Sequence, residues 1–428
     1  MSEAMTDERS LASSPPVADG EAEPTLHRTR TWKRRRAAVR VFTVLTVVAL
    51  VGFGWLGIQG YDAARKIKGG ATAKVITDPS APGYVAAVDA SPVHLVALTD
   101  ASDALSAFLV VVPDPAGGAG TIIWSLGELV VDVDGTPTAL TDIYKSNGLD
   151  AARAEFEKAL GFGSTDVIIV GPKELAAATA SLGTITIKNP DPVLVDQKGK
   201  RVEKYPAGTL SLDPSEFGEY LTTRGAGEAP ANRSTRTSVL FTALVEESAS
   251  GSASSSTGAT SASSGGVATT TTAPSSTNGG LDAAGVLASL GSTAPDFIDL
   301  PMTRQSFKGS YLYSPDADGI AAKLADIVQF PVSAFPGQRP RVRVLNGTAD
   351  VTAASAAAPG LASAGGEVLL VGNAKALDVQ TSSVVYSDDS FKAVADRIAE
   401  IVGVGAEQSE EMSDAADIDV VLGADYQR

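Results

Sequence analysis

The sequence predicts an α/β protein with a single-pass membrane anchor, a larger α/β domain and a small C-terminal domain of β-α-β-β-α-β order. Short apolar runs of strand length alternate with amphipathic segments of helical length, as they do in α/β folds. One N-terminal segment is apolar throughout and follows a block of basic residues. A tract rich in Ser, Thr and Gly interrupts the ordered pattern, which resumes after it.

The composition excludes several kinds of site. The 428 residues include no cysteine and two histidines, His27 and His94. Disulfides, thiolate metal sites and cysteine nucleophiles are therefore excluded, and one chain cannot build a zinc site on histidines. His94 lies in the apolar run "SPVHLVAL", which favours a buried strand residue over a chemical role. The formal net charge of −16 argues against nucleic acid as a partner, because nucleic-acid-binding proteins present basic surfaces.

The N-terminal segment has the pattern of a membrane anchor. "HRTRTWKRRRAAVR" carries seven Lys or Arg residues, and the following "VFTVLTVVALVGFGWLGI" carries no charge. At about 1.5 Å per residue, a helix of this length just spans a bilayer core of roughly 30 Å. Because basic flanks stay in the cytoplasm, we expect residues 1–40 to be a disordered cytoplasmic tail and 41–60 a transmembrane helix. The remaining chain would lie outside the plasma membrane. A cleaved signal peptide is the alternative, with "ATA" at 71–73 as its cleavage pattern.

Residues 61–91 are expected to be a linker, and residues 92–335 to form the larger α/β domain. Four runs of strand length open this domain: "VHLVAL", "AFLVVVP", "TIIWSL" and "ELVVDVDG". The first three are apolar almost throughout, as strands buried on both faces are. "DVDG", residues 132–135, is expected to be a turn, because it lacks the remaining ligand series of a calcium loop.

Two helices with a strand between them come next. "GLDAARAEFEKALG" has apolar residues at helical spacing and ends at Gly161, and "PKELAAATASLG" has Pro172 in its first turn and Gly183 beyond its end. "TDVIIVG" between them predicts a strand. "TITIKN" predicts a further strand, and "VLVDQKGKRVEKY" a hairpin that turns near "KGK".

Two more helices precede the low-complexity tract. In "LDPSEFGEYLTTR", Asp213 is the expected N-cap and Pro214 the first helical residue. "RSTRTSVLFTALVEE" predicts a helix that buries Leu240 and Leu244 with their apolar neighbours. The tract at about 248–280 cannot bury a core, and the segment after it has too few apolar residues for its own domain. We therefore expect a disordered insertion within the larger domain.

Residues 340–428 are expected to form the C-terminal domain. Strands are predicted at "RVRVLNGT", "EVLLVGNA", "SSVVYS" and "DIDVVLGADY", with an amphipathic helix at "SFKAVADRIAEIVG". A helix of small residues, "TAASAAAPGLASAG", is expected to be interrupted near Pro359. Asn346 and Gly347 are expected to supply turn geometry rather than a ligand site. The resulting order is the split βαβ pattern.

The C-terminal unit resembles a domain found on cell-envelope proteins of the LytR-CpsA-Psr group. The resemblance is carried by "VRVLNGT", "LASAGGEVLLVGNA", "SSVVYS", "AVADRIAEIVG" and "DIDVVLGADY", in this order. Residues 92–330 resemble the catalytic domain of the same group through "FLVVVPDP", "TDIYKSNGLDAARAEFEKALGFGSTDVIIVG" and "AGTLSLDPSEFGEYLTTR". The resemblance implies an extracytoplasmic phosphotransferase that moves an anionic glycopolymer from a polyprenyl-pyrophosphate carrier to peptidoglycan. It also implies a divalent cation, acidic residues and several arginines at the site.

Three arginines match the arginines of that group, and they are the candidate anion- or pyrophosphate-binding residues: Arg224, Arg233 and Arg236. Guanidinium groups bind pyrophosphate bidentately and offset the charge that develops when a phosphate leaves. The alternative without a ligand is that the three arginines lie on a solvated helix face and form salt bridges to Glu219, Glu228 or Glu246.

Other charged positions of the group are altered here. The arginine and aspartate of its Arg-Ser-Asp motif fall on Ala104 and Ser106, and those of its Pro-Arg-Asp motif on Gly127 and Glu128. The acidic residue that the group carries three positions before the first of its paired arginines falls on Pro230 here. Asp100 and Asp103 lie nearby, but they could replace the missing acidic residues only if the alignment with the group were shifted. Losing metal ligands removes charge neutralisation worth several kcal/mol, so no metal is predicted, and Mg²⁺ enters only if the chain is a transferase.

Three functions stay open. The first is a membrane-anchored, extracytoplasmic, non-catalytic binder of a wall glycopolymer, a polyprenyl-phosphate lipid or an envelope protein. The second is a divergent phosphotransferase that attaches an anionic glycopolymer to peptidoglycan. The third is a scaffold for protein contacts. We expect the first, because the arginines are retained while the metal-binding positions are not.

Overall fold

The computed structural model describes residues 76–255, 281–307, 310–412 and 414–427. The expected cytoplasmic tail, the transmembrane helix and the first part of the linker lie before residue 76, outside the described residues. Most of the expected insertion at 248–280 also lies outside the described residues. Within the described ranges, no helix is long and apolar enough to cross a bilayer. The α/β class is confirmed, and the buried apolar residues fall into two cores, one before residue 330 and one after residue 340.

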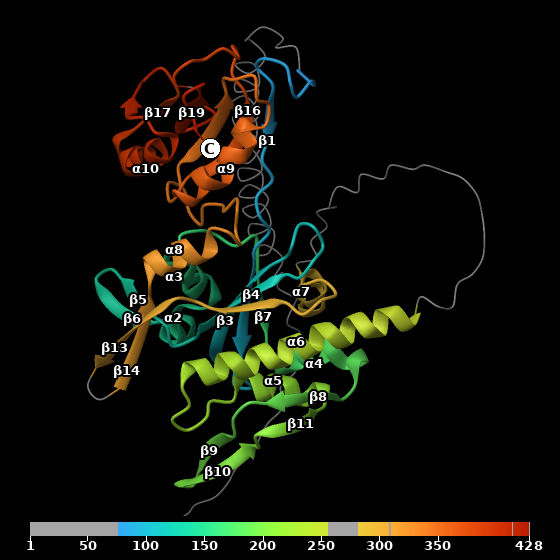
Figure 1. Ribbon diagram of the computed structural model, residues 1–428. Helices are drawn as coiled ribbons and strands as arrows, with labels where there is room; N and C mark the ends of the chain where they lie inside the picture. Colours follow the sequence, from blue (N-terminus) through green and yellow to red (C-terminus); the bar gives the residue numbers. More distant parts are fainter. Residues whose placement is uncertain (1–75, 256–280, 308–309, 413, 428) are drawn as a thin grey trace, which may run out of the picture. The chain divides into compact units, whose positions relative to one another are not determined.

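A five-stranded sheet lies at the centre of the first core (Figure 1). Its strands, in spatial order, are β12 (Asp296–Asp299), β4 (Thr121–Leu126), β3 (Leu105–Val112), β2 (His94–Thr99) and β7 (Asp166–Val170). β3 runs antiparallel to both neighbours, whereas β12 is parallel to β4 and β2 is parallel to β7. The carboxyl ends of β2, β4, β7 and β12 therefore share one edge of the sheet. The three apolar runs expected as buried strands are β2, β3 and β4.

The fourth expected strand forms a separate hairpin. β5 (Val130–Val133) pairs antiparallel with β6 (Thr136–Ala139). The turn between them is the "DVDG" segment, in which the Asp132 carboxylate accepts the Gly135 N–H at 2.7 Å. Asp134 and Gly135 adopt φ values of 51° and 80°, so the expected turn is confirmed.

Two helices cover one side of this sheet. α3 (Leu149–Leu160) ends at Gly161 in the left-handed conformation, as expected. Its Phe156 stacks on Phe108 of β3, with ring centroids 4.8 Å apart. α2 (Leu140–Asn147) precedes it, although the sequence pattern predicts no helix there. Only Leu140 and Ile143 of α2 are buried, which leaves too short an apolar stripe to detect from sequence.

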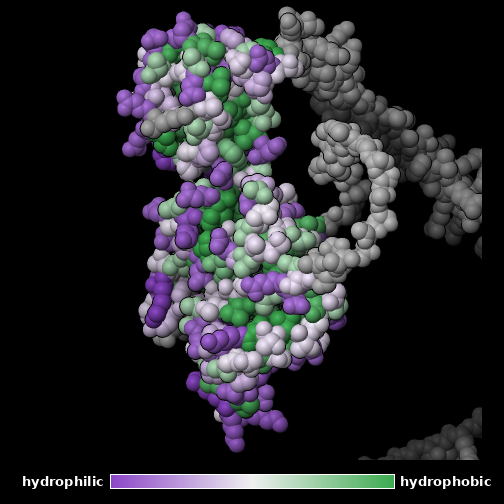
Figure 2. Space-filling view, turned by 45° about the vertical axis from the view of Figure 1, so that its right-hand side comes forward, coloured by the Kyte–Doolittle hydropathy of each residue, from purple (hydrophilic) through white to green (hydrophobic). Residues whose placement is uncertain are grey.

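A second layer is built from residues 172–255. Its helices are α4 (Pro172–Thr179), the 3₁₀ turn η1 (Ala180–Leu182), α5 (Pro214–Thr222) and α6 (Pro230–Ser255), and its strands are β8 (Ile185–Asn189), β9 (Val193–Gln197), β10 (Lys200–Tyr205) and β11 (Gly208–Leu212). β8 pairs with β11, and β9 with β10 through a turn at Lys198 and Gly199. Figure 2 shows hydrophilic residues gathered on this β9–β10 hairpin, at the lower end of the molecule.

The helices α5 and α6 begin where local sequence chemistry favours it. Pro214 opens α5, and the Glu216 carboxylate accepts the N–H of the N-cap residue Asp213 at 2.9 Å. α6 begins at Pro230, before the expected start of the helix, because proline suits the first helical position. Its buried stripe includes Leu240 and Leu244, both fully inaccessible to solvent.

After the gap at 256–280 the chain returns to the central sheet. α7 (Ala283–Ser289) leads into β12, which completes the sheet beside β4. A hairpin of β13 (Met302–Phe307) and β14 (Ser310–Pro315) follows, and then α8 (Ala317–Leu324).

The second core belongs to a six-stranded sheet in the C-terminal domain. Its strands, in spatial order, are β1 (Val85–Ala87), β16 (Glu367–Asn373), β15 (Arg341–Asn346), β19 (Ile418–Leu422), β17 (Ser383–Tyr386) and β18 (Ala406–Gln408). The helices are α9 (Ala353–Ser363) and α10 (Lys392–Val402), the latter preceded by the 3₁₀ turn η3 (Asp389–Phe391). The expected β-α-β-β-α-β order is present, with the short strands β1 and β18 added at the edges.

The helix expected to break near Pro359 is continuous. α9 passes through Pro359, although proline cannot donate the usual hydrogen bond to the carbonyl four residues earlier. Buried residues on both sides of the proline, Ala357, Ala358, Leu361 and Ala362, pack on the same core. This packing holds the helix together where local propensity would interrupt it.

The segment expected as a linker, 61–91, contributes β1 to the C-terminal sheet. Val85 pairs antiparallel with Gly372 of β16, and the two strands lie side by side in Figure 1. A Cβ atom at Gly372 would overlap the Tyr84 carbonyl oxygen, so glycine permits this close approach. The Asn373 side chain donates to the carbonyls of Pro79 and Ala81, at 2.8 and 2.9 Å.

Candidate functional site

The candidate residues gather at the carboxyl edge of the central sheet. Four strands end there, and ligands of α/β sheets bind in the crevice outside such ends. α6 packs against β4 and β12 and so brings its first turns to this edge. The segment between α5 and α6 supplies Arg224, and the turn directly after β4 supplies Glu128.

Glu128 joins two of the three candidate arginines. Its Oε1 lies 2.5 Å from Nη1 of Arg224, and its Oε2 accepts from Nη2 of Arg233 at 2.9 Å. The Arg224 side chain is 67% exposed, the Glu128 side chain 27% and the Arg233 side chain 7%. The carboxylate therefore bridges a guanidinium at the surface and a guanidinium below it.

The charge of Glu128 is set by these contacts. Burial raises the pKa of the Glu128 carboxyl, but Arg233 first and Arg224 second outweigh burial and leave the pKa below its usual value. The carboxylate is therefore ionised at neutral pH, and its two oxygens act only as acceptors.

Arg233 is buried beside the sheet. The whole residue is 6% exposed, and its Cζ lies 5.9 Å from the ring centroid of Trp124 on β4. Its Nε is buried and has no hydrogen-bond partner among the described residues. The next residue, Ser234, donates its hydroxyl to the carboxylate of Asp299 at the end of β12.

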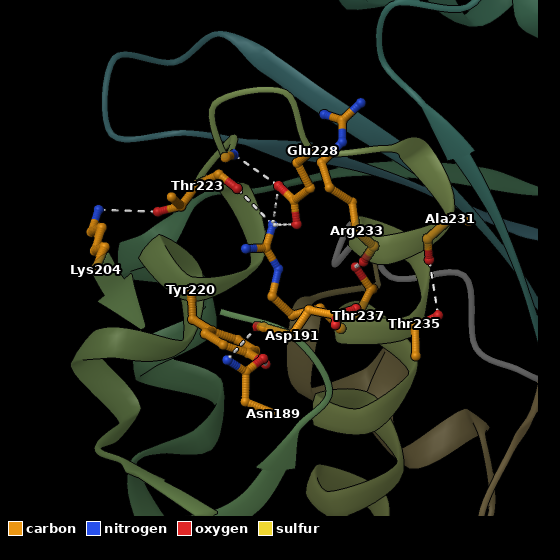
Figure 3. Close-up of polar contacts among 12 residues, drawn as sticks. Asn189, Asp191, Lys204, Tyr220, Thr223, Glu228, Ala231, Arg233, Thr235 and Thr237 are labelled. Carbon is orange, nitrogen blue, oxygen red and sulfur yellow. Dashed lines mark hydrogen bonds and ion pairs between the residues drawn. The ribbon is translucent and has the colours of Figure 1, made fainter. Parts of the chain in front are cut away.

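Arg236 is more deeply enclosed, at 1% exposure. Its Nη2 donates to the Thr223 carbonyl at 2.6 Å and lies 3.4 Å from the Glu228 carboxylate, and its Cζ lies 5.4 Å from the Tyr220 ring centroid. Figure 3 shows Thr223, Glu228 and Tyr220 grouped beside α6. Nε and Nη1 of Arg236 find no partner within the described part of the chain. Burial lowers the pKa of Arg236, and Glu228 and Tyr220 oppose this change.

A buried hydrogen-bond chain supports Arg236 from below. The Tyr220 hydroxyl donates to Oδ1 of Asn189 at 2.9 Å (Figure 3). The Asn189 amide donates in turn to the carbonyls of Asp191 and Pro206 at 2.9 and 2.6 Å. Burial raises the pKa of Tyr220, so its hydroxyl stays protonated and keeps donating. This chain fixes the aromatic face beneath the guanidinium.

The structure corrects the solvated-face alternative for two of the arginines. Arg233 and Arg236 lie on the buried side of α6, and only Arg224 is a surface residue. The salt bridge between Arg236 and Glu228 is present as that alternative expected, but Arg224 and Arg233 pair with Glu128 instead. A sequence signal for their burial existed, because Arg233, Arg236, Leu240 and Leu244 follow one helical stripe.

Asp100, the possible substitute, and Gly127, an altered position, both have local structural roles. The Asp100 carboxylate accepts the N–H groups of Ser102 and Ala104, at 2.8 and 3.1 Å, and so shapes the turn between β2 and β3. A Cβ atom at Gly127 would lie 2.8 Å from the Ser106 carbonyl oxygen, so a larger residue there requires a backbone shift. Within the described ranges, no three or more His, Cys, Asp or Glu side chains are placed to hold a metal ion.

His94 lies at the opposite end of β2. Its Nδ1 is 3.0 Å from the Asp166 carboxylate on the neighbouring strand β7. The imidazole therefore pairs two strands at the amino edge of the sheet, far along β2 from Glu128 and the arginines.

Comparison with protein families identifies the C-terminal domain. Residues 339–426 match the model of the LytR_C family, described as LytR cell envelope-related transcriptional attenuator. This unit is similar to LytR_C domains, and it takes the name LytR_C domain from that match. The resemblance expected for this C-terminal unit is thereby confirmed. Among curated proteins, none matches the chain at a significant level.

Solved structures similar to this chain include three with distant sequences. A transcriptional regulator from Enterococcus faecalis is 16% identical, with 56% of this chain and 86% of that chain covered and a TM-score of 0.39. TagV of B. subtilis is 15% identical, with 55% of this chain and 94% of that chain covered and a TM-score of 0.38. The LytR-CPS2A-psr family protein YwtF (TagT), solved with bound octaprenyl pyrophosphate lipid, is 14% identical to this chain. The match covers 59% of this chain and 93% of that chain, with a TM-score of 0.37.

Proposed function

We propose that this protein binds a phosphate-bearing group of a cell-envelope glycopolymer, or of its polyprenyl lipid carrier, without transferring it. The anion would bind at Arg224 and Arg233, at the carboxyl edge of the central sheet. Arg236 belongs to the same cluster, and it positions the segment 223–228 from beneath. Anchored by residues 41–60, the protein would present this site outside the plasma membrane.

The observation that carries the proposal is the pair of guanidinium groups around Glu128. One is exposed and the other is buried with an unpartnered Nε–H among the described residues. Two arginines that converge on a pair of carboxylate oxygens can equally take two oxygens of one phosphate group, and such charge-assisted contacts are strong. The LytR_C domain supports the envelope setting.

The non-catalytic part of the proposal rests on the residues around this pair. Asp100 is engaged in its own turn, Ser106 and Ala104 carry no charge, and Gly127 has no room for an arginine without a backbone shift. Phosphoryl transfer needs groups that neutralise both the attacking and the leaving oxygens. Binding needs only the arginines.

The test is binding of a polyprenyl-pyrophosphate analogue to the full chain in detergent micelles, with and without Mg²⁺. We expect binding that ignores Mg²⁺ and weakens about tenfold in Arg224→Ala, because one charge-assisted contact is lost. Arg341→Ala is the matched control, since Arg341 is also an exposed arginine in an ion pair, with Asp417 of the LytR_C domain at 2.8 Å. Absence of binding, or an equal loss in both variants, would contradict the proposal.

A second candidate, the divergent phosphotransferase, is favoured by one observation. Glu128 occupies the position where the related group carries an aspartate, and it points at the arginines. If Mg²⁺ strengthens binding in the same assay and Glu128→Gln abolishes that effect, the transferase becomes the better account. The scaffold is the account that remains if no anion binds.

A further inference from the structure

Glu128 holds the donors that an incoming anion would need. Each of its carboxylate oxygens contacts a different guanidinium, at 2.5 Å to Arg224 and 2.9 Å to Arg233. A phosphate group that bridges the same two arginines has to take the place of these two oxygens. The carboxylate and the anion therefore compete for one position.

Glu128 reduces the positive charge at the proposed anion site. It is paired with both Arg224 and Arg233, whereas Arg236 is paired with Glu228 at 3.4 Å. While Glu128 lies between Arg224 and Arg233, an arriving anion gains less net Coulomb attraction. If Glu128 turns away, the two guanidinium groups are left with a larger positive surplus beside the surface.

Glu128 is the carboxylate best placed to turn away. Glu228 is held, since its side chain is 10% exposed and accepts the Gly225 N–H at 2.8 Å. Glu128 is 27% exposed at its side chain, while its backbone is fixed by the hydrogen bond from Gly127 N–H to Ser106 O at 2.9 Å and by the fully buried Leu129. The side chain can rotate toward solvent while the turn stays in place.

We infer that the Glu128 side chain is a built-in competitor for the anion site, which occupies Arg224 and Arg233 until a phosphate-bearing ligand displaces it. The inference rests on the proposed function, because it concerns the same pair of arginines. In this arrangement the site discriminates by charge. A singly charged carboxylate ligand gains nothing over Glu128, whereas a pyrophosphate group brings more charge and more acceptor oxygens to the same donors.

The test compares inorganic pyrophosphate binding by the full chain in wild type, Glu128→Gln and Glu219→Gln, by titration calorimetry. Glu219→Gln is the matched control, since Glu219 pairs with Lys204 at 2.7 Å, whereas Arg224 and Arg233 pair with Glu128. We expect Glu128→Gln to bind pyrophosphate about tenfold more tightly, because a competing charge-assisted contact is removed, and Glu219→Gln to bind like wild type. Acetate should bind Glu128→Gln and not wild type.

The outcomes separate this inference from the proposed function. Binding by wild type that is equal or weaker in Glu128→Gln overturns the competitor and leaves the anion site standing. If neither wild type nor Glu128→Gln binds, the proposed function fails and the inference with it. An equal gain in Glu219→Gln attributes the effect to net charge and also overturns the inference. Should Glu128→Gln fold poorly, Glu128→Asp provides the same comparison, because the shorter carboxylate cannot span both arginines and should also tighten binding.

Discussion

Replacing Arg236 by alanine is expected to destabilise the larger domain strongly. The change leaves the Glu228 carboxylate, 10% exposed at its side chain, without its cation and the Thr223 carbonyl without its donor. Breaking a buried ion pair from one side costs about 3–5 kcal/mol. The N–H of Gly225 still donates to Glu228, and the unpartnered N–H groups of Arg236 are removed, so we expect the lower end, about 3 kcal/mol.

Urea unfolding of the full chain, followed by tryptophan fluorescence, measures this effect. The tryptophans are Trp32, Trp55 and Trp124, so the LytR_C domain contributes no tryptophan signal, and Trp124 reports on the central sheet. With a slope of about 2–3 kcal/mol per molar urea, the midpoint should fall by roughly 1 M. Arg224→Ala is the comparison, because its exposed ion pair is worth less than about 1 kcal/mol. A midpoint for Arg236→Ala no lower than that of Arg224→Ala would refute the reasoning.

Four further outcomes are expected. Because the pKa of Glu128 is lowered, its ion pairs stabilise the fold at pH values above the ordinary carboxyl pKa of 4.5, and this stability is lost as the pH falls through the lowered pKa. Wild type should therefore lose more stability than Glu128→Gln between about pH 5 and 3, and urea midpoints measured across this range would show the difference. Gly127→Ala should cost about 1–3 kcal/mol, because its Cβ would lie 2.8 Å from Ser106 O, and an unchanged fluorescence midpoint would contradict this. Pro359→Ala should stabilise the LytR_C domain by about 1–3 kcal/mol in calorimetry, since α9 regains a hydrogen bond. Asn346→Ala should destabilise the same domain by about 2 kcal/mol, because the buried amide accepts the Thr348 N–H at 2.9 Å and donates to the Thr348 carbonyl at 3.1 Å; an unchanged melting temperature would count against that role.

Much of the fold follows from local sequence patterns. β2, β3 and β4 are apolar runs that the sheet buries on both faces, and Pro214 marks the start of α5 as expected. α2 and β1 escape prediction, since α2 has a short apolar stripe and β1 has three residues and exists through its pairing with β16. The continuity of α9 through Pro359 depends on tertiary packing, which no local pattern records.

The site was predictable in its residue types more than in its contacts. Arg224, Arg233 and Arg236 stand out in an acidic chain, and the sequence brings them within one short segment. The burial of Arg233 and Arg236 follows from their place on the apolar stripe of α6, a signal that the usual exposure of arginine obscures. The pairing with Glu128 joins residues far apart in sequence, so only the packing of α6 against β4 determines it.

The pairing of β1 with β16 has a consequence for how the chain is assembled during synthesis. β1 leaves the ribosome before the larger domain, whereas its partner around Gly372 is made after that domain. β1 must therefore wait, unpaired, until the larger domain and β16 have emerged, and contacts between such distant segments form slowly. A chain released before residue 373 would keep β1 without its partner, so this edge of the C-terminal sheet can close only after the larger domain has been made.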